Sequence, residues 1–163
     1  MTKLAQVAVH ESGHVVAARA LGVGTLAFSL QPLASELGHA QLATKLRTPG
    51  ECRDGMVIFC AGPVAESVAT GEPIRRGGGD EARAWEAAQR LHGLEADPAT
   101  LQVELDRAEA HARALLLANW PAVQRLAAAM VATQAAMETL NDSFPPPAHA
   151  GNDGAGFDPE TVG

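Results

Sequence analysis

The sequence contains no tyrosine, and four phenylalanines with two tryptophans bring its aromatic fraction to only 4%. A core without aromatic rings must be filled by smaller side chains, and alanine, leucine and valine recur throughout a chain that is 47% hydrophobic. These residues favour closely packed helices over aromatic-rich sheets. With 163 residues, the chain has the length of one globular domain.

Positive charge and cysteine are also scarce. The net charge of −7 argues against nucleic acid as a partner, because neutralising phosphates requires a basic face. Cys52 and Cys60 are too few for a disulfide framework, and no CxxC pair is present. The lack of any run of 18 apolar residues predicts that no membrane span is encoded. Residues 1–14 carry two histidines and a glutamate where a signal peptide needs an apolar stretch, so we expect a cytoplasmic protein.

The order of elements can be predicted from periodicity and from turn residues. Helix-forming residues dominate five segments, which are 3–21, 49–70, 80–92, 98–118 and 121–140. Segments 23–33 and 38–47 lose the helical period and indicate a small antiparallel pair of strands. The expected fold class is mainly α, a helical bundle with a small two- to three-stranded β-sheet. The step at Gly62-Pro63 is expected either to kink the second helix or to split it.

Composition changes abruptly near the end of the chain. Residues 144–163 are rich in proline and glycine, contain acidic residues and have no lysine or arginine. Such a segment buries too little apolar surface to order itself, so we expect a disordered tail. The structured domain is accordingly expected to span residues 1–143.

The sequence His10-Glu11-Ser12-Gly13-His14 is an HExxH motif, and it lies within the first expected helix. Residues four apart project from one helical face, so both imidazoles can reach one metal ion. Glu11 lies about 100° around the helix, where its carboxylate can accept a proton from water without ligating the metal. The motif therefore predicts two zinc ligands and a general base.

A catalytic zinc ion takes three protein ligands, so a third must come from another part of the chain. The candidates are Asp80, Glu66, His39, Asp54 and the later histidines. Asp80 follows the glycine-rich run 77–79, which can bring a helix start close to a buried site. Aspartate is equally common as a helix N-cap, and the spacing alone does not decide between the two roles.

Taken together, these segments resemble the zinc peptidase domain of FtsH-type ATP-dependent proteases. The similar segments follow one order and cover residues 3–143; they are HESGHVVAARALG (10–22), LAFSLQPLASELGHAQLATKL (26–46), CAGPVAESVATG (60–71), GGGDEARAWEAA (77–88) and LLLANWPAVQRLAAAMVATQAAMETLND (115–142). The resemblance implies a zincin of the FtsH peptidase type. It implies one zinc ion held by His10, His14 and Asp80, with Glu11 as the catalytic base. Glu66 is expected to orient a ligating histidine from outside the ligand set.

The implied activity is hydrolysis of peptide bonds in peptides or unfolded proteins. The strand that contains Gly38 and His39 is expected to bind substrate as an added β-strand. The chain has no GxxxxGK[ST] phosphate-binding loop and departs from the family at Pro63 and Ser67. These departures argue against ATP-driven, processive degradation and against the hexameric ring of the family. The partners left open are a homo-oligomer and a separate ATPase. The alternative function is a catalytically silent binding or adaptor module that keeps the fold.

Overall fold

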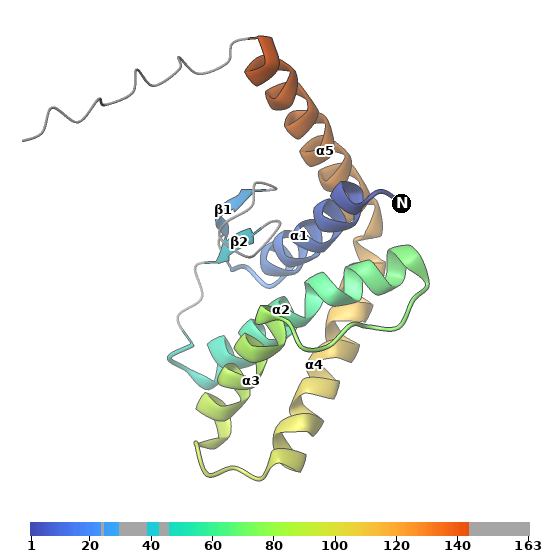
Figure 1. Cartoon of the computed structure of the whole chain (residues 1–163). Coiled ribbons are helices and arrows are strands. Elements are labelled where there is room, and N and C mark those ends of the chain that lie inside the picture. The colour runs from blue at the N-terminus through green and yellow to red at the C-terminus, as the bar shows by residue number, and fades with distance from the viewer. Residues whose placement is uncertain (24, 30–38, 43–45, 144–163) are drawn as a thin grey trace, which may run out of the picture.

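The computed structural model describes residues 1–23, 25–29, 39–42 and 46–143, and five helices account for most of them (Figure 1). These helices are α1 (Lys3–Ala20), α2 (Pro49–Thr70), α3 (Gly79–His92), α4 (Pro98–Ala118) and α5 (Trp120–Ser143). Their bounds agree with the expected helices to within three residues at each end. The chain is therefore a helical protein.

Local capping interactions define both ends of α1. The Thr2 hydroxyl accepts a hydrogen bond from the Ala5 N–H over 3.2 Å, which satisfies one of the free donors of the first turn. After Leu21 the chain turns at Gly22, whose φ of 74° lies in the left-handed region that glycine adopts without strain. The predicted end of this helix is confirmed.

Helix α2 is continuous through the Gly62-Pro63 step. It begins at a capping box, in which Thr48 accepts from the Glu51 N–H while the Glu51 carboxylate accepts from the Thr48 N–H. Pro63 has no N–H, so one backbone hydrogen bond of the helix is missing, but the helix continues to Thr70. Consequently Gly62 and Glu66 lie one turn apart on the same helix.

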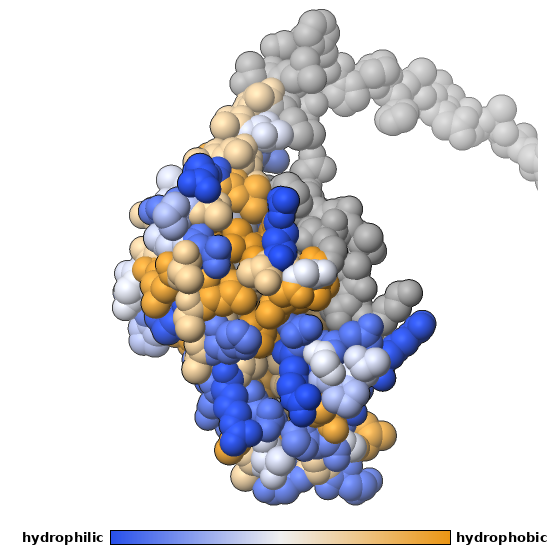
Figure 2. All heavy atoms as spheres, turned by 180° about the vertical axis from the view of Figure 1, so that it is seen from behind, coloured by the Kyte–Doolittle hydropathy of each residue, from blue (hydrophilic) through white to orange (hydrophobic). Residues whose placement is uncertain are grey.

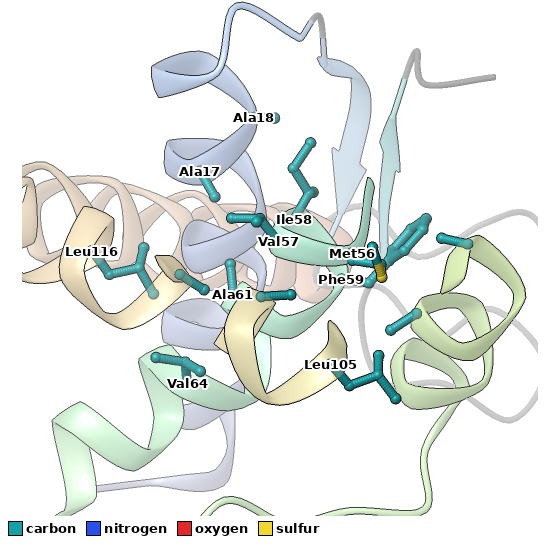
Figure 3. Close-up of a cluster of buried hydrophobic side chains, with 14 of the residues drawn as sticks. Ala17, Ala18, Met56, Val57, Ile58, Phe59, Ala61, Val64, Leu105 and Leu116 are labelled. Carbon is teal, nitrogen blue, oxygen red and sulfur yellow. The ribbon is translucent and has the colours of Figure 1, made fainter. Parts of the chain in front are cut away.

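The hydrophobic core surrounds α2. Figure 3 shows Met56, Ile58, Phe59 and Val64 of α2 among side chains from α1 and α4. Every buried apolar residue that the structure describes lies on a helix, and much of this core is alanine and valine. Small side chains let helices approach closely, as the scarcity of aromatic residues predicted.

Helix α1 is also buried on the side that faces α5. Ala8 packs with Ala127 and Met130 in a second apolar cluster, and the Ser12 hydroxyl lies 3.5 Å from the Met130 sulfur as a weak donor. With α2 on one side and α5 on the other, α1 has buried residues from Ala8 to Ala18. A helix enclosed in this way can carry polar groups only where partners meet them.

The expected fold class needs a correction, because the sheet is not a component of this helical architecture. Strands β1 (Thr25–Ser29) and β2 (His39–Leu42) form one short antiparallel ladder, whose register shifts between Thr25 and Ala27. No third strand occurs among residues 1–23, 25–29, 39–42 and 46–143. Two such short strands are too small to build a layer of their own, so the alternating pattern of segment 38–47 overstated the extent of β structure.

Two expectations lie outside the described residues, namely the disordered tail 144–163 and the substrate contact at Gly38.

Within the described part, no single helix is long and apolar enough to cross a membrane. Helix α4 and residues 120–136 of α5 reach that length and apolar character only when they are taken together, and the two are bent by 81° relative to each other. Seen from behind, apolar residues gather in the middle of the molecule, while the end built by α3 and the start of α4 is mainly hydrophilic (Figure 2).

Candidate metal centre

His10 and His14 lie one turn apart on α1 and face α2. Their Nε2 atoms are 3.1 Å apart, and the two rings meet edge to face at an interplanar angle of 77°. His14 is buried and His10 is partly buried. The helical spacing thus brings the two nitrogens together, as the motif predicted.

Asp80 reaches the same place from the first turn of α3. Its Oδ2 atom lies 2.9 Å from His10 Nε2 and 3.1 Å from His14 Nε2. The N-cap of α3 is Gly78, so Asp80 is free of the capping role that the sequence left open. Its carboxylate is available to the two imidazoles.

The loop before Asp80 is tied to α3 and α4 by Arg76. The Arg76 guanidinium donates to Glu109 on α4 over 3.0 Å and lies 3.9 Å from the Glu81 carboxylate. Glu81 in turn accepts a hydrogen bond from the Gly77 N–H. These contacts set the path of the chain into α3, and thereby the position of Asp80.

The three atoms His10 Nε2, His14 Nε2 and Asp80 Oδ2 form a triangle with edges of 2.9–3.1 Å. Tetrahedral zinc with bonds of about 2.0–2.1 Å separates its ligands by roughly 3.3 Å, close to these edges. The group His10, His14 and Asp80 could therefore hold a metal ion, with a small outward adjustment of its atoms.

The outer nitrogens of both rings have acceptors as partners. His14 Nδ1 lies 2.7 Å from the Ile58 carbonyl oxygen, and His10 Nδ1 lies 2.6 Å from Glu66 Oε1. A carbonyl oxygen can only accept, so His14 Nδ1 carries a proton, and Nε2 of the neutral ring presents a lone pair. The carboxylate of Glu66 favours the same arrangement in His10. Outer acceptors of this kind are typical of histidines that bind metals.

Glycine makes room for the imidazoles at the helix crossing. A Cβ atom on Gly62 would lie 2.6 Å from His10 Nε2 and closer still to His14 Nε2. A Cβ atom on Gly13 would lie 2.6 Å from the Ala61 carbonyl oxygen. Glycine at position 13 therefore lets the backbones of α1 and α2 approach closely, whereas glycine at position 62 leaves space for the ends of the two imidazoles.

Glu11 is the buried acidic residue of the motif, with 4% of its surface exposed. It lies on α1 next to His10, and its charge helps to favour the protonated form of that imidazole. The motif thus places a buried carboxylate on the same helix as the two convergent imidazoles.

The charges at the centre shift the pKa values of its members. Burial disfavours the imidazolium of His10, but hydrogen bonds with Asp80 and Glu66 outweigh it and raise the pKa from 6.5 to about 10. Burial also opposes ionisation of Asp80, yet the charge of His14 and the bonds to both imidazoles hold its pKa far below the usual range. The pKa of Glu66 is lowered too, because bonds from His10 and Gln6 outweigh burial. Ionised carboxylates are the forms that bind cations.

A cleft of about 370 Å³ opens beside the centre. His10 and Asp80 line it together with Glu66, Pro63 and Arg75. A ligand in this cleft would have direct access to the atoms that converge between α1 and α3.

The other expected site residues lie in different places. Glu66 contacts the outer nitrogen of His10 and is not part of the converging triangle. Asp54 is likewise absent from this group in the described chain. His39 lies on β2, and Gly38 falls outside the described residues.

Two residues of the centre were missed in the sequence, Gln6 and Gly62. Gln6 precedes His10 by four positions, so the helical period that paired the histidines could have placed it on their face. Gly62 carries no comparable signal, because its role depends on where α1 crosses α2.

Neither the protein-family models nor the curated proteins compared with this chain match it. The resemblance to FtsH-type peptidases therefore stays a prediction from the sequence segments quoted above.

Proposed function

We propose that this protein is a zinc-dependent metallopeptidase of the FtsH type, which hydrolyses peptide bonds in peptides or unfolded proteins. One observation carries the proposal. Two imidazole nitrogens and a carboxylate oxygen converge within 3.1 Å of one another, while both outer nitrogens face acceptors. One proton can join only two of three converging lone pairs, whereas one cation satisfies all three.

The donor set supports zinc as the cation. Imidazole and carboxylate ligands suit zinc, and a site with three protein ligands leaves a position open for catalysis. The convergent group among the described residues contains no thiol, and burial raises the pKa of the nearby Cys60 thiol to about 12.

A zinc ion held there supplies Lewis acidity toward a carbonyl group and acidifies water. Glu11 then takes a proton from water as the general base, and it returns a proton to the amine that leaves. His10 and His14 are held in place by Glu66 and Ile58, so neither ring needs to reorient during this proton movement.

The first test measures zinc per chain by elemental analysis in the wild type and in Asp80→Ala. We expect one zinc ion in the wild type and an affinity lower by about 100-fold or more in the variant, because one of three ligands is lost. Asp54→Ala is the matched control, since it removes an aspartate outside the group. Equal zinc affinity in Asp80→Ala and Asp54→Ala would show that the third ligand is another residue.

The second test separates hydrolysis from binding. Glu11→Gln should retain zinc and lose peptidase activity on an unfolded substrate by about 10²–10⁴-fold, since the general base is gone. A wild type that binds zinc but cleaves no unfolded substrate would favour the adaptor module.

A further inference from the structure

Gln6 contacts the metal centre through Glu66. Its side-chain Nε2 donates a hydrogen bond of 2.7 Å to Glu66 Oε2, while Glu66 Oε1 faces His10 Nδ1 at 2.6 Å. The two oxygens of one carboxylate are thus engaged by two side chains from consecutive turns of α1.

Glu66 needs such a restraint because its side chain has three rotatable bonds and its carboxylate is ionised. The group is only half-buried and lines the open cleft, so water competes for its oxygens. One hydrogen bond to His10 leaves the carboxylate free to rotate about that contact. A second donor on the other oxygen fixes its plane and its distance from the imidazole.

We infer that Gln6 is a positioning residue of the metal centre, which holds Glu66 on the outer nitrogen of His10 and so fixes the ring that binds the metal. The inference rests on the proposed function. It assigns a series of contacts that runs from Gln6 to Glu66, then to His10, and ends at the position of the ion. Gln6, His10 and His14 follow at intervals of four on one face of α1, and Glu66 on α2 connects the first two of them.

The test compares Gln6→Met with the wild type. Methionine has nearly the shape of glutamine but no donor, so the substitution keeps packing and removes the hydrogen bond. Loss of an outer partner of a ligating histidine lowers metal affinity by about 10–100-fold, and we expect about 10-fold here because Gln6 acts through one further residue. Zinc affinity is measured by competition with a chelator, and the visible spectrum of the cobalt(II)-loaded protein reports the ligand geometry.

Gln102→Met is the matched control. Gln102 also donates to a carboxylate over 2.7 Å, but its partner is Asp106 on the exposed face of α4. This variant should match the wild type in zinc affinity and in cobalt spectrum. If Gln6→Met also matches the wild type, Gln6 positions nothing and the inference is overturned.

A double-mutant cycle identifies the route of the effect. In a Glu66→Ala background, Gln6→Met should change zinc affinity by less than twofold, because the residue through which Gln6 acts is gone. An undiminished effect in that background would overturn the inference. Absence of zinc from the wild type is a different result, since it overturns the proposed function itself.

Discussion

The candidate metal centre joins two regions that are held in different ways. His10 and His14 come from one buried helix, and each ring is anchored at its outer nitrogen by an acceptor on α2. Asp80 comes from the start of α3, after a loop whose main tie is the half-exposed guanidinium of Arg76. Exposed ion pairs contribute little free energy, whereas buried packing and buried hydrogen bonds contribute much more. The histidine pair is therefore preformed on one helix, whereas the position of Asp80 depends on the packing of α3 against α2 and on the exposed contacts of the loop before it.

The largest effect is expected from a change that breaks the preformed pair. Gly62→Ala places a Cβ atom 2.6 Å from His10 Nε2, so the imidazoles must move away from each other or from Asp80. We expect zinc affinity to fall by about 100-fold or more, as for the loss of a ligand. The fold should persist, because the groups that must move are the ends of side chains.

Gly50→Ala serves as the control for this variant. Gly50 also lies on α2, and a Cβ atom there meets only the Thr48 hydroxyl at 3.9 Å. Its zinc affinity should equal that of the wild type. Retention of tight zinc binding by Gly62→Ala would mean that the two histidines are less confined than the crossing of α1 and α2 indicates.

An intermediate effect is expected from pH. The stability contributed by His10 falls as pH rises, whereas the stability contributed by Asp80 falls as pH decreases. In the metal-free protein the pKa of His10 is raised to about 10 in the fold, from 6.5 when unfolded. Its contribution to stability is therefore complete below pH 6.5 and is lost as pH rises toward 10. The pKa of Asp80 is lowered, so its contribution is present above the usual aspartate range and is lost on acidification.

Urea unfolding of metal-free protein between pH 3 and 10 measures how the free energy of unfolding changes with pH, both on the acid side and on the alkaline side. In His10→Ala, the fall of this free energy on the alkaline side (the alkaline branch) should become flatter. Zinc should reverse that branch, because ligation needs a deprotonated imidazole and affinity then rises with pH by up to about 10-fold per unit for each proton released. An alkaline branch that persists unchanged in His10→Ala would assign the effect to another group.

The smallest effect is expected from loosening the loop. Arg76→Ala removes the contacts with Glu109 and Glu81, so Asp80 must be ordered when the metal binds. We expect zinc affinity to fall by about two- to fivefold, with a change in unfolding free energy below about 1 kcal/mol.

Arg90→Ala is the control for this loop variant, because Arg90 forms an exposed pair with Glu86 within α3. Equal zinc affinities for the two arginine variants would contradict the view that Asp80 is held by its loop.

The two regions also differ in how well the sequence predicted them. His10 and His14 follow from a local period, and a helix fixes that period wherever it lies. Asp80 was one of several candidates until the resemblance favoured it, because its approach depends on a loop and on α4. The small role of the β-ladder could not be predicted, since alternation in a sequence does not say how many residues will pair.

Gln6 and Gly62 show a further limit. Their importance arises where two helices cross, and the crossing point is set by many small side chains together. The lack of aromatic residues predicted close packing, but it did not predict which glycine would face the imidazoles. Only the contacts in the structure identify these two positions.

In the pattern HExxH, two of the five letters stand for any amino acid, yet this protein leaves neither position free. Ser12 is fully enclosed and faces Met130 of α5, while Gly13 faces the backbone of α2. Three of the five positions thus carry the polar groups of the site, while Ser12 is constrained by α5 and Gly13 by α2. The information needed to specify the site is therefore larger than the motif states, because a side chain at position 13 would meet the backbone of α2.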